Sequence, residues 1–136
     1  MTVRPVSTED IPALTRVHVD AWRETYTGIV PQSFLDSLTY ENREARWQRI
    51  LAEPRPDDIN FVAEVDGQVV GFSSGGRERQ YDGEFTGELY ALYLLKSAQG
   101  RGLGRRLFEA VVEHLVSKSY SNMLIWVLRD NPTVKF

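Results

Sequence analysis

A short glycine-rich segment carries the strongest chemical signal in the sequence. Gln99-Gly100-Arg101-Gly102-Leu103-Gly104 has a glycine at every second position and leads into a stretch with helical periodicity. Glycine removes the Cβ atom where a backbone must approach a ligand closely, and the first turn of a helix carries N–H groups without intrahelical partners. With the helix dipole, these groups predict an anion site, to which Arg101, Arg105 and Arg106 add guanidinium donors.

Other interpretations of a glycine-rich loop fit this sequence less well. A P-loop requires Gly-Lys-Ser or Gly-Lys-Thr, whereas Gly104 is followed by Arg105-Arg106. A dinucleotide-binding loop requires glycine at position 105 and a repeated βαβ pattern, and neither is present. A plain strand-to-helix connection with solvated arginines is the structural alternative. The long apolar strand before the loop and the amphipathic helix after it favour the anion site.

The elements on either side of the loop follow from hydrophobic periodicity. Residues 84–95 form the longest extended segment, and its nearly all-apolar second half suits a strand buried on both faces. After the loop, residues at i, i+4 spacing mark one face of a long helix: Leu103, Leu107, Val111 and Leu115. Residues 122–128 are rich in β-branched and aromatic side chains and predict another strand.

The N-terminal half predicts a strand, helices and a hairpin. Ser7-Thr8-Glu9-Asp10 is typical of a helix start, and apolar residues at spacings of three and four follow it. The expected elements are a strand at 2–6, a first helix that ends before Gly28, and helices that begin at Pro31 and near Glu41. Strands at 60–65 and 68–74 follow around an Asp66-Gly67 turn, and 75–83 is expected to be a loop or a frayed strand end. This order is typical of an α+β or three-layer mixed fold rather than a doubly wound sheet.

Composition limits the classes of protein that fit. The chain has 136 residues, 42% hydrophobic and 26% charged, so residues 1–136 are expected to form a single domain. The absence of cysteine excludes disulfides and a thiol nucleophile, and it is compatible with the cytoplasmic location that we expect. No apolar run suits a signal peptide or a membrane span. A net charge of −3 argues against broad nucleic-acid binding.

The stretch from Glu88 to Phe108 resembles the acetyl-CoA motif of the general N-acetyltransferase (GNAT) superfamily. That motif consists of a strand, Gln/Arg-x-x-Gly-x-Gly/Ala and a helix, and Gln99, Gly102 and Gly104 fill its defined positions. The order of elements over nearly the whole chain also follows the family. The resemblance implies an α+β, three-layer α/β/α fold with a mixed, mainly antiparallel sheet. Residues 21–28 look like one branch of the family with small-molecule or uncertain acceptors.

The resemblance also implies acetyl-CoA as the acyl donor. In the family, a bulged strand at the position of residues 92–94 offers backbone groups to the pantetheine arm and the acyl carbonyl, and the glycine loop wraps the pyrophosphate. An asparagine near the end of the fifth strand bonds the cofactor. The cofactor-binding residues expected from this are Leu92, Tyr93, Leu94, Gln99, Gly100, Arg101, Gly102, Leu103, Gly104, Arg105 and Asn131.

Acyl transfer from a thioester to an amine requires a neutral amine, although a free alkylamine has a pKa of roughly 10. A carboxylate can take the proton, usually through water. We expect Glu88 to be this catalytic base, because it lies four residues before Leu92 and a regular strand points both side chains to one face. Several GNAT enzymes place a glutamate there. A solvated or arginine-paired glutamate is the alternative, and Glu84 is a second candidate base.

The acceptor side is less well marked. Trp22 and Tyr26, four residues apart on the first helix, are expected to be substrate-binding, although core packing explains them equally well. His18 and His114 are expected to be structural or surface histidines. Because no histidine–carboxylate cluster has the spacing of metal ligands, no metal site is predicted.

The sequence stops at Phe136, just before the position of a family tyrosine that commonly protonates the CoA thiolate. The rest of that helix and two final strands of the family also lie beyond this point. We therefore expect a C-terminally incomplete GNAT domain whose strand at 122–128 has an open edge. A clipped sequence, a truncated gene product and completion by a partner chain stay open, and the edge would suit a homodimer.

Three functions fit these observations. The first is acetyl transfer from acetyl-CoA to an amine of a small molecule or protein by direct attack, because no cysteine is available for a thiol acyl-enzyme. The second is a non-catalytic acyl-CoA-binding or regulatory module. The third is an interaction domain that uses the open sheet edge. The sequence does not specify the acceptor.

Overall fold

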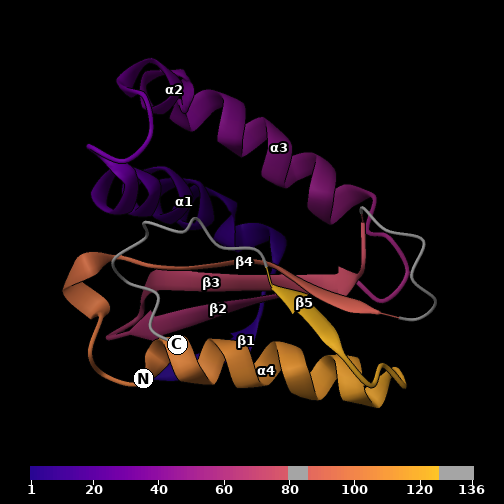
Figure 1. Cartoon of the computed structure of the whole chain (residues 1–136). Coiled ribbons are helices and arrows are strands. Elements are labelled where there is room, and N and C mark those ends of the chain that lie inside the picture. The colour runs from indigo at the N-terminus through magenta and orange to yellow at the C-terminus, as the bar shows by residue number, and fades with distance from the viewer. Residues whose placement is uncertain (80–85, 126–136) are drawn as a thin grey trace.

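A sheet separates two helical layers in the computed structural model of the chain, which describes residues 1–79 and 86–125. Three helices cover one face and α4 covers the other (Figure 1). The described strands are β1 (Thr2–Pro5), β2 (Ile59–Val65), β3 (Gln68–Arg77), β4 (Gly87–Leu94) and β5 (Met123–Ile125). The helices are α1 (Ile11–Tyr26), α2 (Gln32–Ser37), α3 (Tyr40–Ala52) and α4 (Leu103–Ser117), with short 3₁₀ turns η1 (Thr8–Asp10) and η2 (Lys96–Ala98).

The five strands lie in the order β1-β2-β3-β4-β5. Neighbours from β1 to β4 are antiparallel, whereas β5 runs parallel to β4. Such a mixed sheet between helical layers confirms the predicted α+β, three-layer α/β/α fold. Among the described residues, no helix is both long and apolar enough to cross a membrane.

The start of α1 is held by Asp10. Its carboxylate accepts the backbone N–H of Ser7 at 2.8 Å and both Nη atoms of Arg4 at 2.8 Å each. Arg4 also pairs with Glu64 on the neighbouring strand β2. These bonds connect the first strand, the helix start and the hairpin, which fixes the angle at which α1 enters its layer.

Apolar side chains fill both faces of the sheet. On the α1 and α3 side, the core contains Leu14, Val17, Trp47, Val62 and Phe72. On the other side lie the four α4 residues that the sequence predicted, all buried: Leu103, Leu107, Val111 and Leu115. Full burial of each aliphatic side chain contributes about 1.5–3 kcal/mol, so α4 is fixed firmly against the sheet.

The strand β3 is longer than predicted. Residues 75–83 were expected to be a loop or a frayed strand end, and the structure shows strand at their start, because Gly75 and Gly76 pair with β4 and β3 continues to Arg77. A Cβ on Gly75 would lie 2.5 Å from Val111 Cγ1. The glycine there therefore serves close packing of α4 on the sheet rather than a turn.

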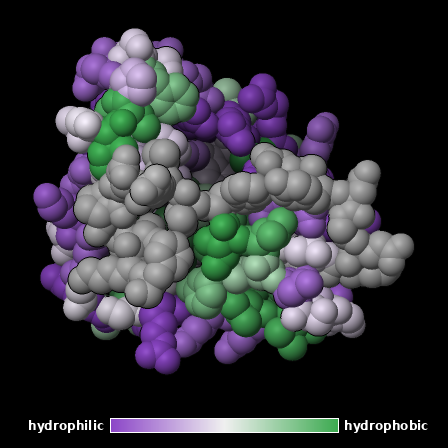
Figure 2. Space-filling model, in the orientation of Figure 1, coloured by the Kyte–Doolittle hydropathy of each residue, from purple (hydrophilic) through white to green (hydrophobic). Residues whose placement is uncertain are grey.

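β5 falls inside the strand predicted at 122–128, of which residues 126–128 lie outside the described part. Figure 2 shows apolar side chains gathered where β5 crosses the molecule, and Ile125 is 47% exposed. The homodimer expected through an open edge stays a prediction.

Candidate functional site

The glycine loop forms the N-terminal end of α4, as predicted. Gly100 and Gly102 have φ angles of +81° and +80°, in the left-handed region that favours glycine, and Gly102 is the N-cap of the helix. Within the described residues, no acceptor bonds the backbone N–H groups from Gly100 to Arg105. These donors and the dipole of a 15-residue helix make this end of α4 suited to a phosphate.

The loop is attached to the end of β4 by its side chains. The Gln99 amide donates to the Leu94 carbonyl at 3.4 Å, and the Leu103 side chain is buried in the core. A Cβ on Gly104 would lie 3.4 Å from Leu94 Cδ1, so the glycine lets the first turn of α4 pack on the strand. Leu103 can thus offer only its backbone to a ligand.

Arginines around the loop reach solvent. Arg101 is exposed, and Arg105 donates to Glu109 at 2.8 Å within an exposed pair on the surface of α4. Arg106 donates instead to the carbonyl of Met1. Exposed ion pairs contribute little stability, so Arg105 can exchange Glu109 for a ligand phosphate at small cost.

β4 is irregular at Tyr90. Ser74 pairs with Ala91 whereas Gly75 pairs with Leu89, which leaves Tyr90 as an extra residue on β4. The register shift therefore lies at Tyr90, just before residues 92–94, to which the family resemblance assigned the bulge. A bulge reverses the alternation of faces along the strand, and this decides where the side chains of β4 point.

The expectation that Glu88 and Leu92 share a face is wrong. Leu89 and Leu92 both pack on the α4 side, because the bulge between them shifts the alternation by one residue. Glu88, next to Leu89, lies on the opposite side and is fully buried. Its Oε1 accepts the backbone N–H of Arg79 at 2.9 Å, and its Oε2 accepts Arg79 Nη2 at 2.9 Å. Glu84 lies outside the described residues, as does Asn131.

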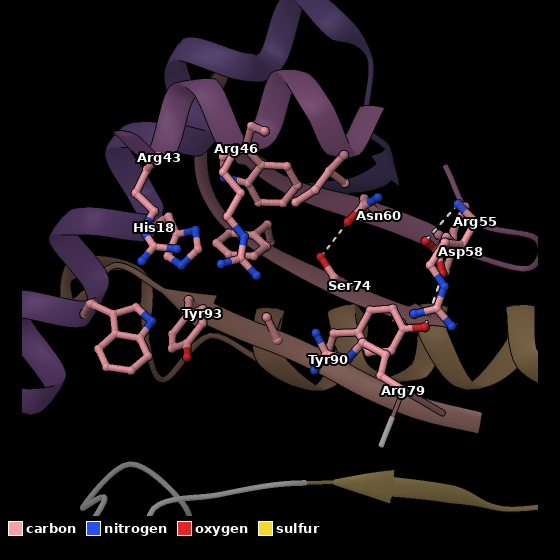
Figure 3. Close-up of a pocket in the computed structure, with 17 residues that line it drawn as sticks. His18, Arg43, Arg46, Arg55, Asp58, Asn60, Ser74, Arg79, Tyr90 and Tyr93 are labelled. Atoms are coloured by element: carbon pink, nitrogen blue, oxygen red, sulfur yellow. Dashed lines mark hydrogen bonds between the residues drawn. The ribbon is translucent and has the colours of Figure 1, made fainter. Parts of the chain in front are cut away.

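A cavity of about 440 Å³ lies between α1, α3 and the face of the sheet formed by β2, β3 and β4 (Figure 3). This size falls in the range of small-molecule sites, roughly 300–1,000 Å³. Apolar, aromatic, polar and charged side chains line it: His18, Trp22, Arg43, Arg46, Trp47, Ile50, Arg55, Asp58, Ile59, Asn60, Phe72, Ser74, Gly75, Arg79, Tyr90, Ala91 and Tyr93.

One end of the cavity holds paired polar groups. Asp58 accepts the backbone N–H of Arg55 and the Tyr90 hydroxyl, each at 3.2 Å. The guanidinium of Arg79 lies over the Tyr90 ring, 4.1 Å from its centroid. Burial raises the pKa of Tyr90, and the nearby Asp58 carboxylate adds to this, so the hydroxyl stays protonated and donates.

The other end holds aromatic rings and two arginines. His18 stacks on Tyr93 with 5.8 Å between ring centroids, and Arg43 and Arg46 reach from α3 toward them (Figure 3). Burial lowers the pKa of His18 to about 4, and both guanidiniums add to the shift. Burial likewise raises the pKa of Tyr93, with a contribution from Tyr26. Both rings are therefore uncharged near pH 7.

The predicted acceptor residues have different positions. Trp22 lines the cavity, whereas Tyr26 is buried behind it, 4.4 Å from Trp22 between ring centroids. His18, expected to be structural or on the surface, is part of the cavity wall. Among cofactor candidates, Leu92 and Leu94 face α4, whereas Tyr93 turns its side chain into the cavity. His114 contacts the Asp57 carbonyl at 3.0 Å, away from the cavity.

Sequence reasoning missed the arginines of α3, the Asp58–Tyr90 pair and Arg79. Arg43, Arg46, Trp47 and Ile50 repeat at helical spacing, which could have marked a polar side of α3 next to its apolar stripe. No comparable signal links Asp58 with Tyr90. In residues 1–79 and 86–125, no group of three or more His, Cys, Asp or Glu side chains could hold a metal ion.

Comparison with known proteins decides the family. The acetyltransferase (GNAT) family matches residues 16–136. The chain belongs to the GNAT family. YuaI, an uncharacterised N-acetyltransferase of Bacillus subtilis (strain 168), is 40% identical to this GNAT chain over 137 residues, which cover 100% of the chain and 76% of YuaI.

Solved structures agree with the GNAT fold. PaiA N-acetyltransferase from Thermoplasma acidophilum, in complex with coenzyme A, has a TM-score of 0.78 and 22% identity over 96% of this chain and 81% of PaiA. Ribosomal-protein-alanine N-acetyltransferase from Brucella melitensis has a TM-score of 0.70 and 27% identity over 92% and 73% of the two chains. The predicted family, fold, class of acetyl-CoA-dependent N-acetyltransferase and acyl donor are confirmed. These comparisons do not determine the acceptor.

Proposed function

We propose that this GNAT chain transfers the acetyl group of acetyl-CoA to the amine of a small molecule held in the cavity between α1, α3 and the sheet. The main support for this proposal is the way in which side chains alternate between the two faces of β4. Leu92 and Leu94 pack toward the start of α4, whereas Tyr93 faces the cavity. One strand thus lies between a phosphate-suited loop and a pocket of small-molecule size.

The donor would be held mainly by backbone groups. The unpartnered N–H groups from Gly100 to Arg105 fit the pyrophosphate, and Arg101 and Arg105 can add charge-assisted bonds from solvent. In this proposal Gln99 keeps the loop joined to β4, and the backbone of residues 92–94 meets the pantetheine arm. Asn131, outside the described residues, stays a proposed cofactor contact from the family motif.

The reaction is direct attack on the thioester. The neutral amine nitrogen forms a bond to the acetyl carbon, the carbon–sulfur bond breaks, and the CoA sulfur leaves as a thiolate. The amine loses one proton to a base, and the thiolate takes up one proton to give free CoA. The products are the acetamide and CoA. Orientation of the two substrates supplies much of the rate, since it makes the attack effectively intramolecular.

Glu88 is the proposed base, and it can act only when Arg79 frees one of its carboxylate oxygens. Both carboxylate oxygens of Glu88 accept hydrogen bonds from Arg79. Glu88 can take a proton, directly or through water, once the exposed Arg79 side chain releases Oε2. Asp58 is a second candidate, because its carboxylate lines the cavity itself.

A non-catalytic acyl-CoA-binding module is the second candidate function. The occupied carboxylate of Glu88 favours it, since a base with both oxygens engaged is not ready to act. Calorimetric titration with acetyl-CoA, followed by amine-dependent release of CoA over a panel of amines, separates the possibilities. Binding together with turnover supports the enzyme, and binding without turnover supports the module. Absence of binding at high micromolar acetyl-CoA would refute both.

A further inference from the structure

Two arginines of α3 that line the cavity have no anionic partner among the described residues. Arg43 and Arg46 lie three residues apart on α3, and both line the cavity. Within the described parts of the chain, neither guanidinium forms an ion pair or a hydrogen bond. Arg79, at the other end of the cavity, differs from them because its Nη2 forms an ion pair with Glu88 Oε2 at 2.9 Å. The α3 end of the cavity therefore carries unbalanced positive charge.

The arrangement is unfavourable for Arg43, which is half-buried beside the exposed Arg46. Burial lowers the pKa of Arg43, and the positive charge of Arg46 lowers it further. Three buried nitrogen atoms of the same wall also have no hydrogen-bond partner in the described part of the chain, namely Arg43 Nε, His18 Nδ1 and Trp47 Nε1. Buried polar groups are normally paired, so an unpaired set around one cavity calls for an explanation. An anion bound between the guanidiniums would relieve the repulsion.

The side chains around the two arginines indicate the chemical character of the rest of the ligand. Trp47, Phe72 and Tyr93 provide an apolar wall, and His18 completes it as a neutral ring. Asp58, the one carboxylate among the described residues that line the cavity, is at the far end and already accepts two hydrogen bonds. A ligand with an anionic group and an apolar body therefore fits this end, whereas a polycation does not.

We propose that Arg43 and Arg46 bind the oxyanion of the acceptor, so that the acceptor is a small amine bearing a carboxylate or phosphate. This proposal rests on the proposed function, which supplies the amine acceptor and the acetyl-transfer reaction. Planar guanidiniums bind both anions through paired N–H bonds. The donor phosphates have a separate site, because no residue of the glycine loop lines the cavity.

Pairs of amines that differ only in the anion test the proposal. The release of CoA from acetyl-CoA is measured with phenylalanine against phenethylamine, and with O-phosphoethanolamine against ethanolamine. The member with the anion is expected to have a kcat/KM roughly 10- to 100-fold higher in at least one pair, and the pair that responds distinguishes carboxylate from phosphate. Equal values in both pairs, or a preference for spermidine, would overturn the proposal.

Variants of α3 assign the effect to the two arginines. R43M and R46M keep the apolar stem and remove the charge. Each is expected to raise KM for the anionic amine about tenfold or more and to change KM for its neutral counterpart much less. R49M removes an exposed arginine of the same helix outside the cavity and should change neither value. An equal loss of acetyl-CoA affinity in R43M would show that Arg43 serves the donor instead.

A binding measurement separates this proposal from the acetyltransferase assignment. Tryptophan fluorescence is titrated with N-acetylphenylalanine and with N-phenethylacetamide, since Trp22 and Trp47 line the cavity. Tighter binding of the acid, lost in R43M but kept in R49M, supports the anion site even if no amine is turned over. Turnover of amines with equal binding of the two acetamides would leave the enzyme assignment intact and refute the anion site.

Discussion

Arg79 occupies both carboxylate oxygens of Glu88. Its backbone N–H donates to Oε1 and its Nη2 donates to Oε2, each at 2.9 Å. Glu88 is fully buried, whereas the Arg79 side chain is 37% exposed and stacks over Tyr90. Arg79 lines the cavity, whereas Glu88 does not, so the glutamate is connected to the cavity through this arginine. A ligand group that takes the place of Arg79 Nη2 at Oε2 must displace the Arg79 side chain.

Glu88→Gln tests the proposed base. The amide keeps the size of the side chain but cannot take the proton, so kcat should fall about 100-fold or more, in line with the usual contribution of a general base. The dissociation constant for acetyl-CoA should change less than about threefold. Asp58→Asn is the matched control at the carboxylate that lines the cavity. If the control loses turnover and Glu88→Gln keeps it, the proton goes to Asp58.

Gly102→Val tests the donor site. A branched side chain at φ +80° is strained, and it would stand in the path of the pyrophosphate at the helix start. Calorimetry should show at least a tenfold weaker binding of acetyl-CoA. Gly67→Val is the matched control, because Gly67 has φ +77° in the β2–β3 hairpin and is likewise open to space. Equal affinities in the two variants would contradict the loop assignment.

His18 should make stability depend on pH. Its pKa is lowered from 6.5 to about 4 in the folded protein, so the unfolded chain binds more protons between these values. The free energy of unfolding therefore falls as the pH drops from 6.5 toward 4, by an amount on the order of 2–3 kcal/mol from this residue. Urea unfolding at pH 7 and 4.5 measures it.

His18→Gln should remove that part of the pH dependence, since glutamine does not titrate. His114→Gln, at the other histidine of the chain, is the control and should retain it. The pH-dependent change in the free energy of unfolding is compared between wild type and His18→Gln, because carboxylates also titrate at low pH and contribute equally to both. If the free energy of unfolding changes with pH in the same way in wild type and His18→Gln, His18 is protonated as easily in the folded chain as in the unfolded chain.

Asp10→Asn should destabilise the fold. The Arg4 guanidinium holds the pKa of Asp10 below its usual range, so the ionised carboxylate contributes stability above pH 4, and this is lost as pH falls further. The loss at pH 7 should be about 1–3 kcal/mol, a range that allows for the partial exposure of Arg4. Thermal or urea unfolding measures it. Glu9→Gln, at an exposed neighbouring carboxylate, should cost far less, and equal costs would contradict the role of the Arg4 pair.

The sequence by itself determined the parts of the molecule that depend on local signals. The glycine loop, the buried stripe from Leu103 to Leu115 and the hairpin at Asp66-Gly67 each follow from residue types at fixed short spacing. These features identify the fold and the phosphate-suited end of α4, because helix periodicity, helix dipoles and turn preferences act over a few residues.

Only the tertiary structure decided the arrangement of side chains around the cavity. The bulge at Tyr90 depends on how β3 and β4 pair, and it places Glu88 against Arg79 rather than on the face of Leu92. The cavity likewise joins α3 arginines to a strand some fifty residues away in sequence, as with Arg43 and Tyr93. Such contacts depend on the register of strands and the packing of distant elements, and a local pattern carries no information about either.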